Sequence, residues 1–182
     1  ADVNYQAPYM VMQLVAGDYS QIELRVLAHL SGDAALRRAF ADNLDVHALT
    51  AAALFGVDEA NVTRDMRGVG KTINFAVIYG QSDFALSKAL DVERAQAAAY
   101  IKSFFERYEG VRRYFDGLVE AAKESGYVTT MFGRRRALGD LHSRNAHLRQ
   151  AAQRIAQNTP IQGSAADIMK RAMLAVNEQL NA

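Results

Sequence analysis

The pattern of hydrophobic and polar positions changes its period close to the start of the chain. Residues 10–16 form an almost unbroken apolar run that ends at Gly17, which is typical of a strand buried on both faces. Asp18 lies where this predicted strand would end. A carboxylate in such a position costs hydration energy, so its presence indicates a site that uses it.

From Gln21 onward the apolar positions recur at helical spacing, which predicts a helix. One face of this helix carries Glu23, Val26, Leu27 and Leu30, so a single charge lies on an apolar stripe. Because acids are seldom buried without a partner, the sequence predicts a partner for Glu23. The alternative is an acid that is stabilised only by the positive end of the helix dipole.

The rest of the chain is predicted to be mostly helical. The expected helices span residues 34–41, 46–55, 62–79, 92–108 and 111–125, with a short helix capped by Ser82 and ending at Leu90. Gly110 is expected to divide the last two long helices, and Gly126 to end the second of them.

Residues 127–132 and Gly133 predict one arm and the turn of a β-hairpin, whose return arm would carry arginines. A last helix over residues 145–158 is expected to break at Pro160 and to resume as far as about Leu180. The predicted class is therefore α+β and predominantly helical.

Composition narrows the class of protein. The chain has 182 residues, half of them hydrophobic, which is enough for the core of one domain. It has no cysteine, no signal-type apolar segment and no apolar run near 18 residues. These features predict a soluble protein of a reducing compartment, the cytoplasm, with no membrane partner.

The positive charge is unevenly distributed, although the net charge is only +1. Residues 130–160 hold six arginines against one aspartate, a local charge of +5. Such a basic region favours phosphate binding, and the alternative is an ordinary solvated surface. The arginines are Arg134, Arg135, Arg136, Arg144, Arg149 and Arg154, and the aspartate is Asp140.

The predicted helix over residues 62–79 has two different faces. Steps of 100° per residue place two cations and then two aromatic rings on one face, Arg67, Lys71, Phe75 and Tyr79. Met66, Val69, Ile73, Ala76 and Val77 cluster opposite and would pack inward. Two cations one turn apart can hold a polyphosphate, with the arginine gripping two oxygens. The alternative is an exposed face with partly buried aromatic rings.

Two glycines interrupt this helix near its start. Gly68 and Gly70 should each cost about 1 kcal/mol relative to alanine, which would leave the first turns less rigid.

Several motifs resemble family A DNA polymerases, the bacterial DNA polymerase I group. Residues 18–25, Asp-Tyr-Ser-Gln-Ile-Glu-Leu-Arg, resemble motif A, and Arg67-x3-Lys71-x3-Phe75-x3-Tyr79-Gly80 resembles motif B. His47 in Asp-Val-His, residues 133–135 and residues 158–163 follow the family's order. The resemblance covers residues 14–180. The first 13 residues differ from the family, and the His-Asp-Glu of motif C is not present.

The resemblance implies a palm over residues 1–31, helical fingers over 32–149 and a palm helix region over 150–182. The palm would contribute a partial antiparallel sheet. The implied activity is template-directed nucleotidyl transfer, in which a primer 3′-hydroxyl attacks the α-phosphate of a deoxynucleoside triphosphate. The resemblance also implies two Mg²⁺ ions, with Asp18 and the Tyr19 carbonyl as metal ligands.

The resemblance assigns most of the remaining candidate residues to the incoming nucleotide. The nucleotide-binding set is Tyr19, Gln21, Glu23, His47, Arg67, Lys71, Phe75 and Tyr79. Catalytic roles fall on Asp18, Arg67 and Lys71. Glu23 would fill the space of a ribose 2′-hydroxyl and hydrogen-bond to Tyr79. Phe75 matches the position that discriminates against nucleotides without a 3′-hydroxyl.

The remaining candidates concern duplex DNA, since the resemblance also implies template-primer DNA as a partner and a chain that works as a monomer. The DNA-binding set is Tyr79, Gly80, Arg134, Arg135, Arg154, Asn158 and Gln162. Arg154, Asn158 and Gln162 would reach the minor groove, where acceptors are present for every correct base pair. For Asn158 and Gln162 the alternative is hydrogen bonding around Pro160.

Without motif C, Asp18 is the single matched metal carboxylate, so we expect the 182-residue chain alone to be inactive. Asp167 is interpreted as an ordinary helix residue. One alternative is a non-catalytic fragment that binds template-primer or nucleotide. Another is a helical interaction domain in which the motifs have no use.

Overall fold

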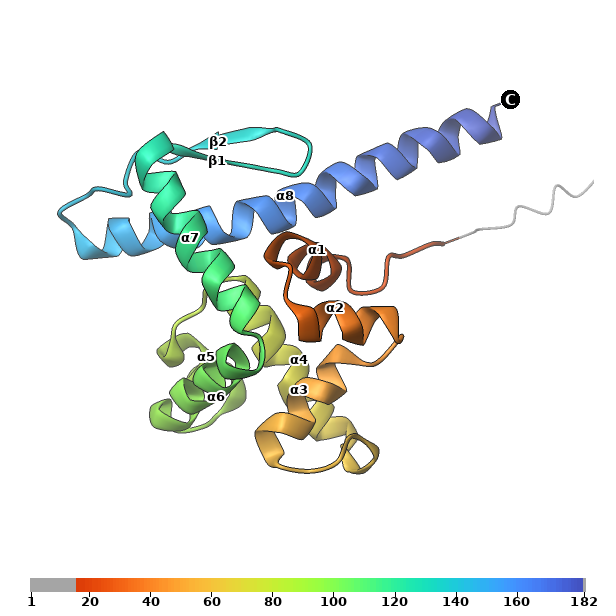
Figure 1. Cartoon of the computed structure of the whole chain (residues 1–182), viewed down its shortest axis with the longest axis vertical. Helices are drawn as coiled ribbons and strands as arrows, with labels where there is room; N and C mark the ends of the chain where they lie inside the picture. The colour runs from red at the N-terminus through yellow and green to blue at the C-terminus, as the bar shows by residue number, and fades with distance from the viewer. Residues whose placement is uncertain (1–15, 182) are drawn as a thin grey trace, which may run out of the picture.

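The computed structural model describes residues 16–181, which are helical apart from one small sheet (Figure 1). This confirms the predicted α+β, predominantly helical class. The helices are α1 Ile22–Ser31, α2 Ala34–Ala41, α3 Val46–Phe55, α4 Arg64–Ile78, α5 Asp83–Leu90, α6 Arg94–Arg107, α7 Glu109–Ser125 and α8 Ala146–Leu180, with a 3₁₀ turn η1 at Glu59–Asn61. The strands are β1 Tyr127–Thr129 and β2 Arg135–Ala137. The strand predicted over residues 10–16 lies, apart from Ala16, outside the described residues.

Side chains before the helices determine where several of them begin. The Asp33 carboxylate accepts from the Leu36 N–H at α2, and Asp45 accepts from the N–H groups of His47 and Ala48 at α3. The Ser82 hydroxyl accepts from the Ala85 N–H, so the predicted cap of α5 is confirmed.

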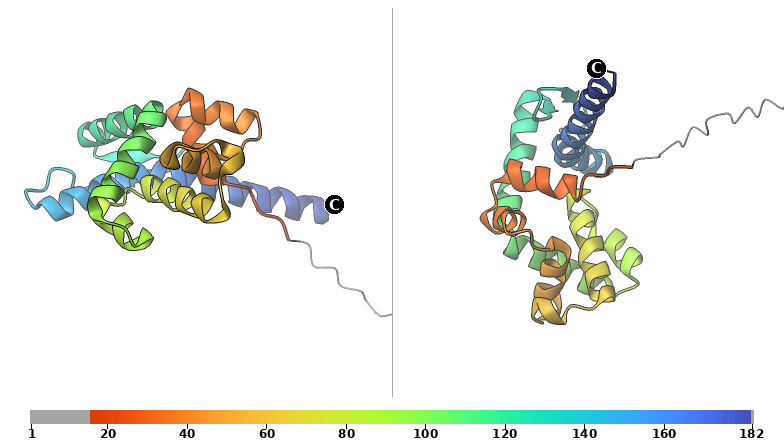
Figure 2. Two further views of the ribbon diagram at one scale, coloured as in Figure 1. Left: turned by 90° about the horizontal axis from the view of Figure 1, so that it is seen from below. Right: turned by 90° about the vertical axis from the view of Figure 1, so that its right-hand side faces the viewer.

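The helices surround one main core, and α8 runs along one side of it (Figures 1 and 2). α8 contacts α1, α4, α7 and the hairpin strand β1. α3 and α4 pack against each other as the most extensive helix pair. The fully buried side chains of the main core come from all eight of the described α-helices and include Leu24, Leu36, Val46, Ile73, Leu86, Phe104, Val111 and Ile161. This packing places the start of α1 opposite α4.

The structure confirms that β2, the return arm of the predicted hairpin, carries arginines. β1 and β2 pair antiparallel, with Val128 opposite Arg136 and Thr129 opposite Arg135. Val128 is buried in a second small core with residues of α7 and α8, whereas the residues of β2 are exposed. The hairpin is therefore fixed on one face and presents arginines on the other.

The predicted break at Pro160 is wrong, because α8 is continuous from Ala146 to Leu180. A proline inside a helix costs about 3 kcal/mol by removing a hydrogen bond and crowding the preceding turn. Here Ala156, Pro160 and Ile161 are all buried, so packing on both sides of the proline offsets this cost. The Thr159 hydroxyl also donates to the Ile155 carbonyl at 2.7 Å and supports the preceding turn.

The predicted division at Gly110 is also wrong, since α6 and α7 separate at Tyr108 and Gly110 lies in the first turn of α7. The Gly110 N–H donates to the buried Asp33 carboxylate at 2.8 Å. A Cβ at Gly110 would lie 2.8 Å from both Asp33 Cα and Oδ2. Glycine is needed here for close approach and does not end a helix.

Among the described residues, no helix is long and apolar enough to span a bilayer.

Candidate functional site

A cavity of about 510 Å³ lies between the segment leading into α1 and the exposed face of α4. It brings together every residue that the sequence assigned to the metal or the nucleotide. These are Asp18, Tyr19, Gln21 and Glu23 from the first wall and His47, Arg67, Lys71, Phe75 and Tyr79 from the second. Residues separated by up to 61 positions in the sequence therefore share one site.

Glu23 has the partner that its position predicted. The Tyr79 hydroxyl donates to Glu23 Oε2 at 2.9 Å and so connects α1 to the end of α4. Burial and the hydrogen bond to the Glu23 carboxylate raise the pKa of Tyr79 to about 12. The phenol therefore remains a hydrogen-bond donor throughout the neutral range.

The two faces of α4 are arranged as the sequence predicted. Ile73, Ala76 and Val77 are buried in the main core. On the other face the rings of Phe75 and Tyr79 are stacked, with centroids 5.9 Å apart. This face therefore offers cations at its start and a flat aromatic surface at its end.

Gly70 has a packing role that the sequence did not reveal. It is buried where α4 crosses α3, and a Cβ there would overlap the His47 carbonyl oxygen and lie 3.0 Å from the Ala51 nitrogen. Gly68, by contrast, has nothing within 4 Å of such a Cβ. Gly70 allows the two helices to approach each other, and so helps to place His47 beside α4.

Arg67 is held by an acid that sequence reasoning did not assign to the site. Its Nε donates to Asp45 Oδ2 at 2.6 Å, while both side chains remain partly exposed. Burial acts to raise the pKa of Asp45. Hydrogen bonds from Arg67 and from the Ala48 N–H outweigh this effect and hold the pKa below its usual value. Asp45 thus both caps α3 and orients the guanidinium.

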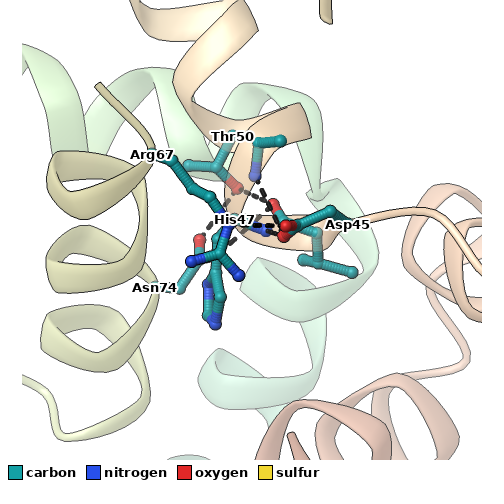
Figure 3. A network of polar contacts seen from close by, with 7 residues as sticks. Asp45, His47, Thr50, Arg67 and Asn74 are labelled. Carbon is teal, nitrogen blue, oxygen red and sulfur yellow. Dashed lines mark hydrogen bonds and ion pairs between the residues drawn. The ribbon is translucent and has the colours of Figure 1, made fainter. Parts of the chain in front are cut away.

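His47 lies in a buried polar network with Asn74 and Thr50 (Figure 3). Asn74 Nδ2 is 2.9 Å from His47 Nδ1, and the Thr50 hydroxyl is 2.9 Å from Asn74 Oδ1. Burial lowers the pKa of His47, and the charges of Arg67 and Lys71 lower it further against the opposing effect of Asp45. Sequence reasoning missed Asn74, because steps of 100° per residue place it beside Arg67 on the face that was expected to be exposed.

The start of α1 supplies polar groups that lack partners within the described part of the chain. Gln21 has a left-handed φ of 54°, and its Oε1 is buried without a hydrogen bond. Asp18 and Tyr19 are exposed and line the same cavity. Unpaired oxygens at this wall are available to a ligand.

The donors at this wall fit a magnesium ion that takes part of its coordination from other ligands. Asp18 and the Tyr19 backbone offer hard oxygen ligands, and Mg²⁺ commonly uses one or two carboxylates plus water and substrate phosphates. Among residues 16–181 no three His, Cys, Asp or Glu side chains gather closely enough to hold a metal by themselves.

The predicted DNA-binding residues lie on the hairpin and along α8. Arg134 donates to the Gly163 carbonyl at 3.0 Å and forms an ion pair of 3.0 Å with Asp167. Asp167 thus has a structural partner, which agrees with its interpretation as a helix residue without a metal-binding role. Hydrogen bonds from the side chains of Thr130 and Arg134 lower its pKa. Arg135 is exposed, and its guanidinium lies over the Tyr127 ring.

The other DNA-binding candidates gather where α4 ends against α8. Asn158 Nδ2 donates to the Tyr79 carbonyl at 3.3 Å. A Cβ at Gly80, whose φ is +59°, would lie 3.0 Å from the Arg154 side chain. Arg154 and Gln162 are exposed on α8. The structure thus places Asn158 and Arg154 beside the end of the cavity wall.

Comparison with known proteins identifies the family. The model of DNA polymerase family A matches residues 5–182. The chain therefore belongs to DNA polymerase family A. It is 52% identical over 168 residues to DNA polymerase I of Pseudomonas aeruginosa, covering 92% of this chain and 18% of that protein. It is 50% identical over 167 residues to DNA polymerase I of Caldicellulosiruptor bescii, covering 92% and 20%.

A solved structure supports the same assignment. The chain resembles the POL domain of Pol1 from M. smegmatis, solved in complex with a DNA primer-template and dNTP, with a TM-score of 0.85 and 42% identity. The match covers 90% of this chain and 29% of that one. The chain thus spans about a fifth of the length of its curated relatives.

Proposed function

We propose that this chain forms the nucleotide-handling part of a DNA-directed DNA polymerase. The reaction would transfer a nucleotide from a deoxynucleoside triphosphate to a primer 3′-hydroxyl under the direction of a template. The observation that carries this proposal is the single cavity in which Asp18 and Glu23 face the cationic and aromatic side of α4. The ligands of the M. smegmatis domain, a DNA primer-template and dNTP, support the same substrates.

Asp18 and the Tyr19 carbonyl would hold Mg²⁺ at the first wall of the cavity, together with oxygens of the triphosphate. In a site with two such ions, the metal supplies charge stabilisation for the attacking and leaving oxygens. Glu23 is already hydrogen-bonded to Tyr79, so Asp18 is the cavity carboxylate available for this role.

Arg67, Lys71 and His47 would bind the β- and γ-phosphates. Asp45 occupies Nε of Arg67 and leaves its two terminal nitrogens for phosphate oxygens. Lys71 is exposed one turn further along α4 and adds a second positive charge. These cations would stabilise the negative charge that develops on the departing pyrophosphate.

Phe75 and Tyr79 would bind the sugar and the base of the incoming nucleotide. Their stacked rings form the aromatic part of the second wall of the cavity. At the edge of this wall the Tyr79 hydroxyl donates a hydrogen bond to Glu23. A carboxylate fixed at this position would exclude a ribose 2′-hydroxyl and so favour deoxyribonucleotides.

The duplex would lie against the hairpin and α8, contacted by the predicted DNA-binding residues. We assign residues 1–31 and 150–182 to the palm and residues 32–149 to the fingers of a protein that acts as a monomer. Arg135, Arg154 and Gln162 are exposed and available to DNA. Arg134 would have to share its guanidinium with Asp167, which is 3.0 Å away.

The second candidate function is binding of nucleotide or template-primer without catalysis. It is favoured by the cavity's acids: among the described residues that line it, Glu23 is hydrogen-bonded to Tyr79 and Asp18 alone remains, whereas a two-metal site would need a second carboxylate. On this basis we expect the 182-residue chain alone to bind triphosphate and not to extend a primer. Primer extension by the chain alone, abolished by Asp18→Asn, would contradict this expectation.

A chimera separates the two functions. Replacing the matching segment of the P. aeruginosa polymerase with this chain should give an enzyme that extends a primer as the template directs. Asp18→Asn should abolish primer extension. Asp116 forms an exposed ion pair with Arg112, so Asp116→Asn serves as the control and should leave primer extension intact. A folded chimera that binds DNA and triphosphate but never extends a primer would overturn the catalytic proposal and favour the second candidate.

A further inference from the structure

The side chain of Asn74 is buried next to the His47 ring. Asn74 is 0% exposed and projects from α4 toward α3, where its amide meets the imidazole (Figure 3). The Asn74 Nδ2 to His47 Nδ1 distance of 2.9 Å is that of a hydrogen bond. Only one orientation of the amide makes Nδ1 the acceptor.

The Val46 carbonyl favours this orientation. With Nδ2 next to the imidazole, its second hydrogen points at the Val46 carbonyl, 3.5 Å away. The opposite orientation would place Oδ1 against that carbonyl oxygen, an arrangement without a donor. The Thr50 hydroxyl is 2.9 Å from both Oδ1 and the Val46 carbonyl, so it can donate to the amide in this orientation and accept from it in the other. The Val46 carbonyl is therefore the group that decides the orientation.

The imidazole is set between charges of both signs. Asp45 lies at the start of its own helix, and Arg67 and Lys71 face it from α4. Asp18 and Glu23 line the other wall of the same cavity. Burial and the two cations lower the pKa of His47, which favours the neutral ring.

A neutral imidazole has one N–H, and its hydrogen bond at one nitrogen determines the state of the other. Because Nδ1 accepts from Asn74, the proton must be on Nε2. Nε2 forms no hydrogen bond to any described residue, and the ring lines the cavity. A proton on Nδ1 would meet the amide hydrogens and require Asn74 to turn.

We propose that Asn74 is a positioning residue that holds His47 as the neutral Nε2–H tautomer, so that this N–H donates into the cavity. The assignment of the acceptor as a triphosphate oxygen rests on the function proposed above; the tautomer itself does not. His47 then adds a directed donor beside Arg67 and Lys71 without adding a third positive charge. The Val46 carbonyl supports it by orienting the Asn74 amide.

The tautomer can be measured directly on the unliganded 182-residue chain. Two-bond ¹⁵N–¹H correlation spectra of histidine-labelled protein distinguish Nε2–H, Nδ1–H and doubly protonated rings. His47→Gln identifies the signals of His47 among the four histidines. We expect a neutral Nε2–H ring at pH 7. An Nδ1–H ring or a doubly protonated ring would overturn the proposal whether or not the chain binds nucleotide.

Two variants test whether Asn74 is the cause. Asn74→Asp keeps the shape of the side chain but replaces the donor with an acceptor, so a proton should move to Nδ1 and the pKa of His47 should rise above that of the parent chain. Asn74→Ala removes the donor altogether and should populate both tautomers. Circular dichroism verifies the fold of each variant. A ring that stays in the neutral Nε2–H form alone in either folded variant would contradict the proposal.

A double-mutant cycle connects the tautomer to ligand binding. Asn74→Ala, which lets the proton move from Nε2 to Nδ1, should weaken binding of a deoxynucleoside triphosphate with Mg²⁺ by up to about tenfold, the effect of losing one hydrogen bond to a charged oxygen. The same change made in His47→Gln should have little further effect, because the ring it positions is gone. Equal losses in both backgrounds would overturn the positioning role. Absence of triphosphate binding by the parent chain would instead overturn the proposed function and leave the tautomer result standing.

Discussion

The Tyr79 hydroxyl donates a 2.9 Å hydrogen bond to the Glu23 carboxylate across 56 residues of sequence. It joins the end of α4 to the start of α1 and closes one edge of the cavity. The contact gives the acid on the apolar stripe of α1 a partner and places both groups at the part of the cavity that we propose receives the sugar of the nucleotide.

Removing the Glu23 carboxylate should open the cavity to ribonucleotides. In the polymerase chimera, Glu23→Ala should lower the ratio of deoxyribonucleotide to ribonucleotide incorporation by at least about tenfold, or 1.4 kcal/mol. Tyr79→Phe keeps the ring but releases Glu23, so it should shift the ratio in the same direction by a smaller factor. A ratio that stays at the parent value in both variants would mean that Glu23 does not select the sugar.

The raised pKa of Tyr79 predicts a loss of stability at high pH. The unfolded chain releases the phenolic proton near the ordinary value of 10.0, whereas the folded chain keeps it until about 12. Between these values the folded state binds more protons, so the free energy of unfolding falls as pH rises. Burial raises the pKa of Tyr114 to about 12 as well, so the parent chain contains two such contributions.

Urea unfolding at a series of pH values measures this slope. Tyr79→Phe should make it shallower between pH 10 and 12 and leave the part that comes from Tyr114. Identical slopes in the parent and variant chains would show that Tyr79 does not hold its proton in this way.

Gly70 and Gly68 should respond oppositely to the same substitution. Gly70→Ala places a Cβ against the His47 carbonyl and should destabilise the chain by about 1 to 3 kcal/mol, as overpacking does. Gly68→Ala meets nothing within 4 Å and should stabilise α4 by up to about 1 kcal/mol. Thermal or urea unfolding of the two variants checks this, and equal effects would mean that α3 and α4 are not in close contact at Gly70.

The sequence alone predicts the parts of this molecule that depend on local patterns. The bounds of α2 and α3, the Ser82 cap and the two faces of α4 follow from helical period and capping residues. The residues of the cavity were found because motif spacing identifies them one by one, and the fold places them together.

The missed features depend on contacts between distant segments. Pro160 remains inside α8 because buried neighbours offset its cost, and no local pattern reports that burial. The Arg67–Asp45 pair, the Arg134–Asp167 pair and the Asn74–His47 hydrogen bond each join different helices or a helix and a loop. Such partners become visible only when the packing of the helices is known.

Binding of a DNA duplex should depend strongly on salt, since exposed arginines lie on the hairpin and α8. The logarithm of the association constant should fall with the logarithm of salt concentration at a slope of about −0.9 per phosphate contact. Arg135→Ala should make this slope about 0.9 shallower. Arg94 is paired with Asp83 on other helices, so Arg94→Ala serves as the control and should leave the slope unchanged. Fluorescence anisotropy of a labelled duplex measures both, and an affinity that is independent of salt would contradict the basic DNA surface.

Calorimetric titration of the 182-residue chain with a deoxynucleoside triphosphate and Mg²⁺ tests the central claim, that the cavity between α1 and α4 is a nucleotide site. The parent chain should bind one triphosphate saturably. Lys71→Ala should weaken this binding at least about tenfold and leave duplex affinity nearly unchanged, because one charged contact to phosphate is lost. The Lys102 side chain is 77% exposed on α6 and lies outside the cavity, so Lys102→Ala should bind triphosphate as the parent chain does. No saturable binding, or equal losses in the two lysine variants, would contradict the account.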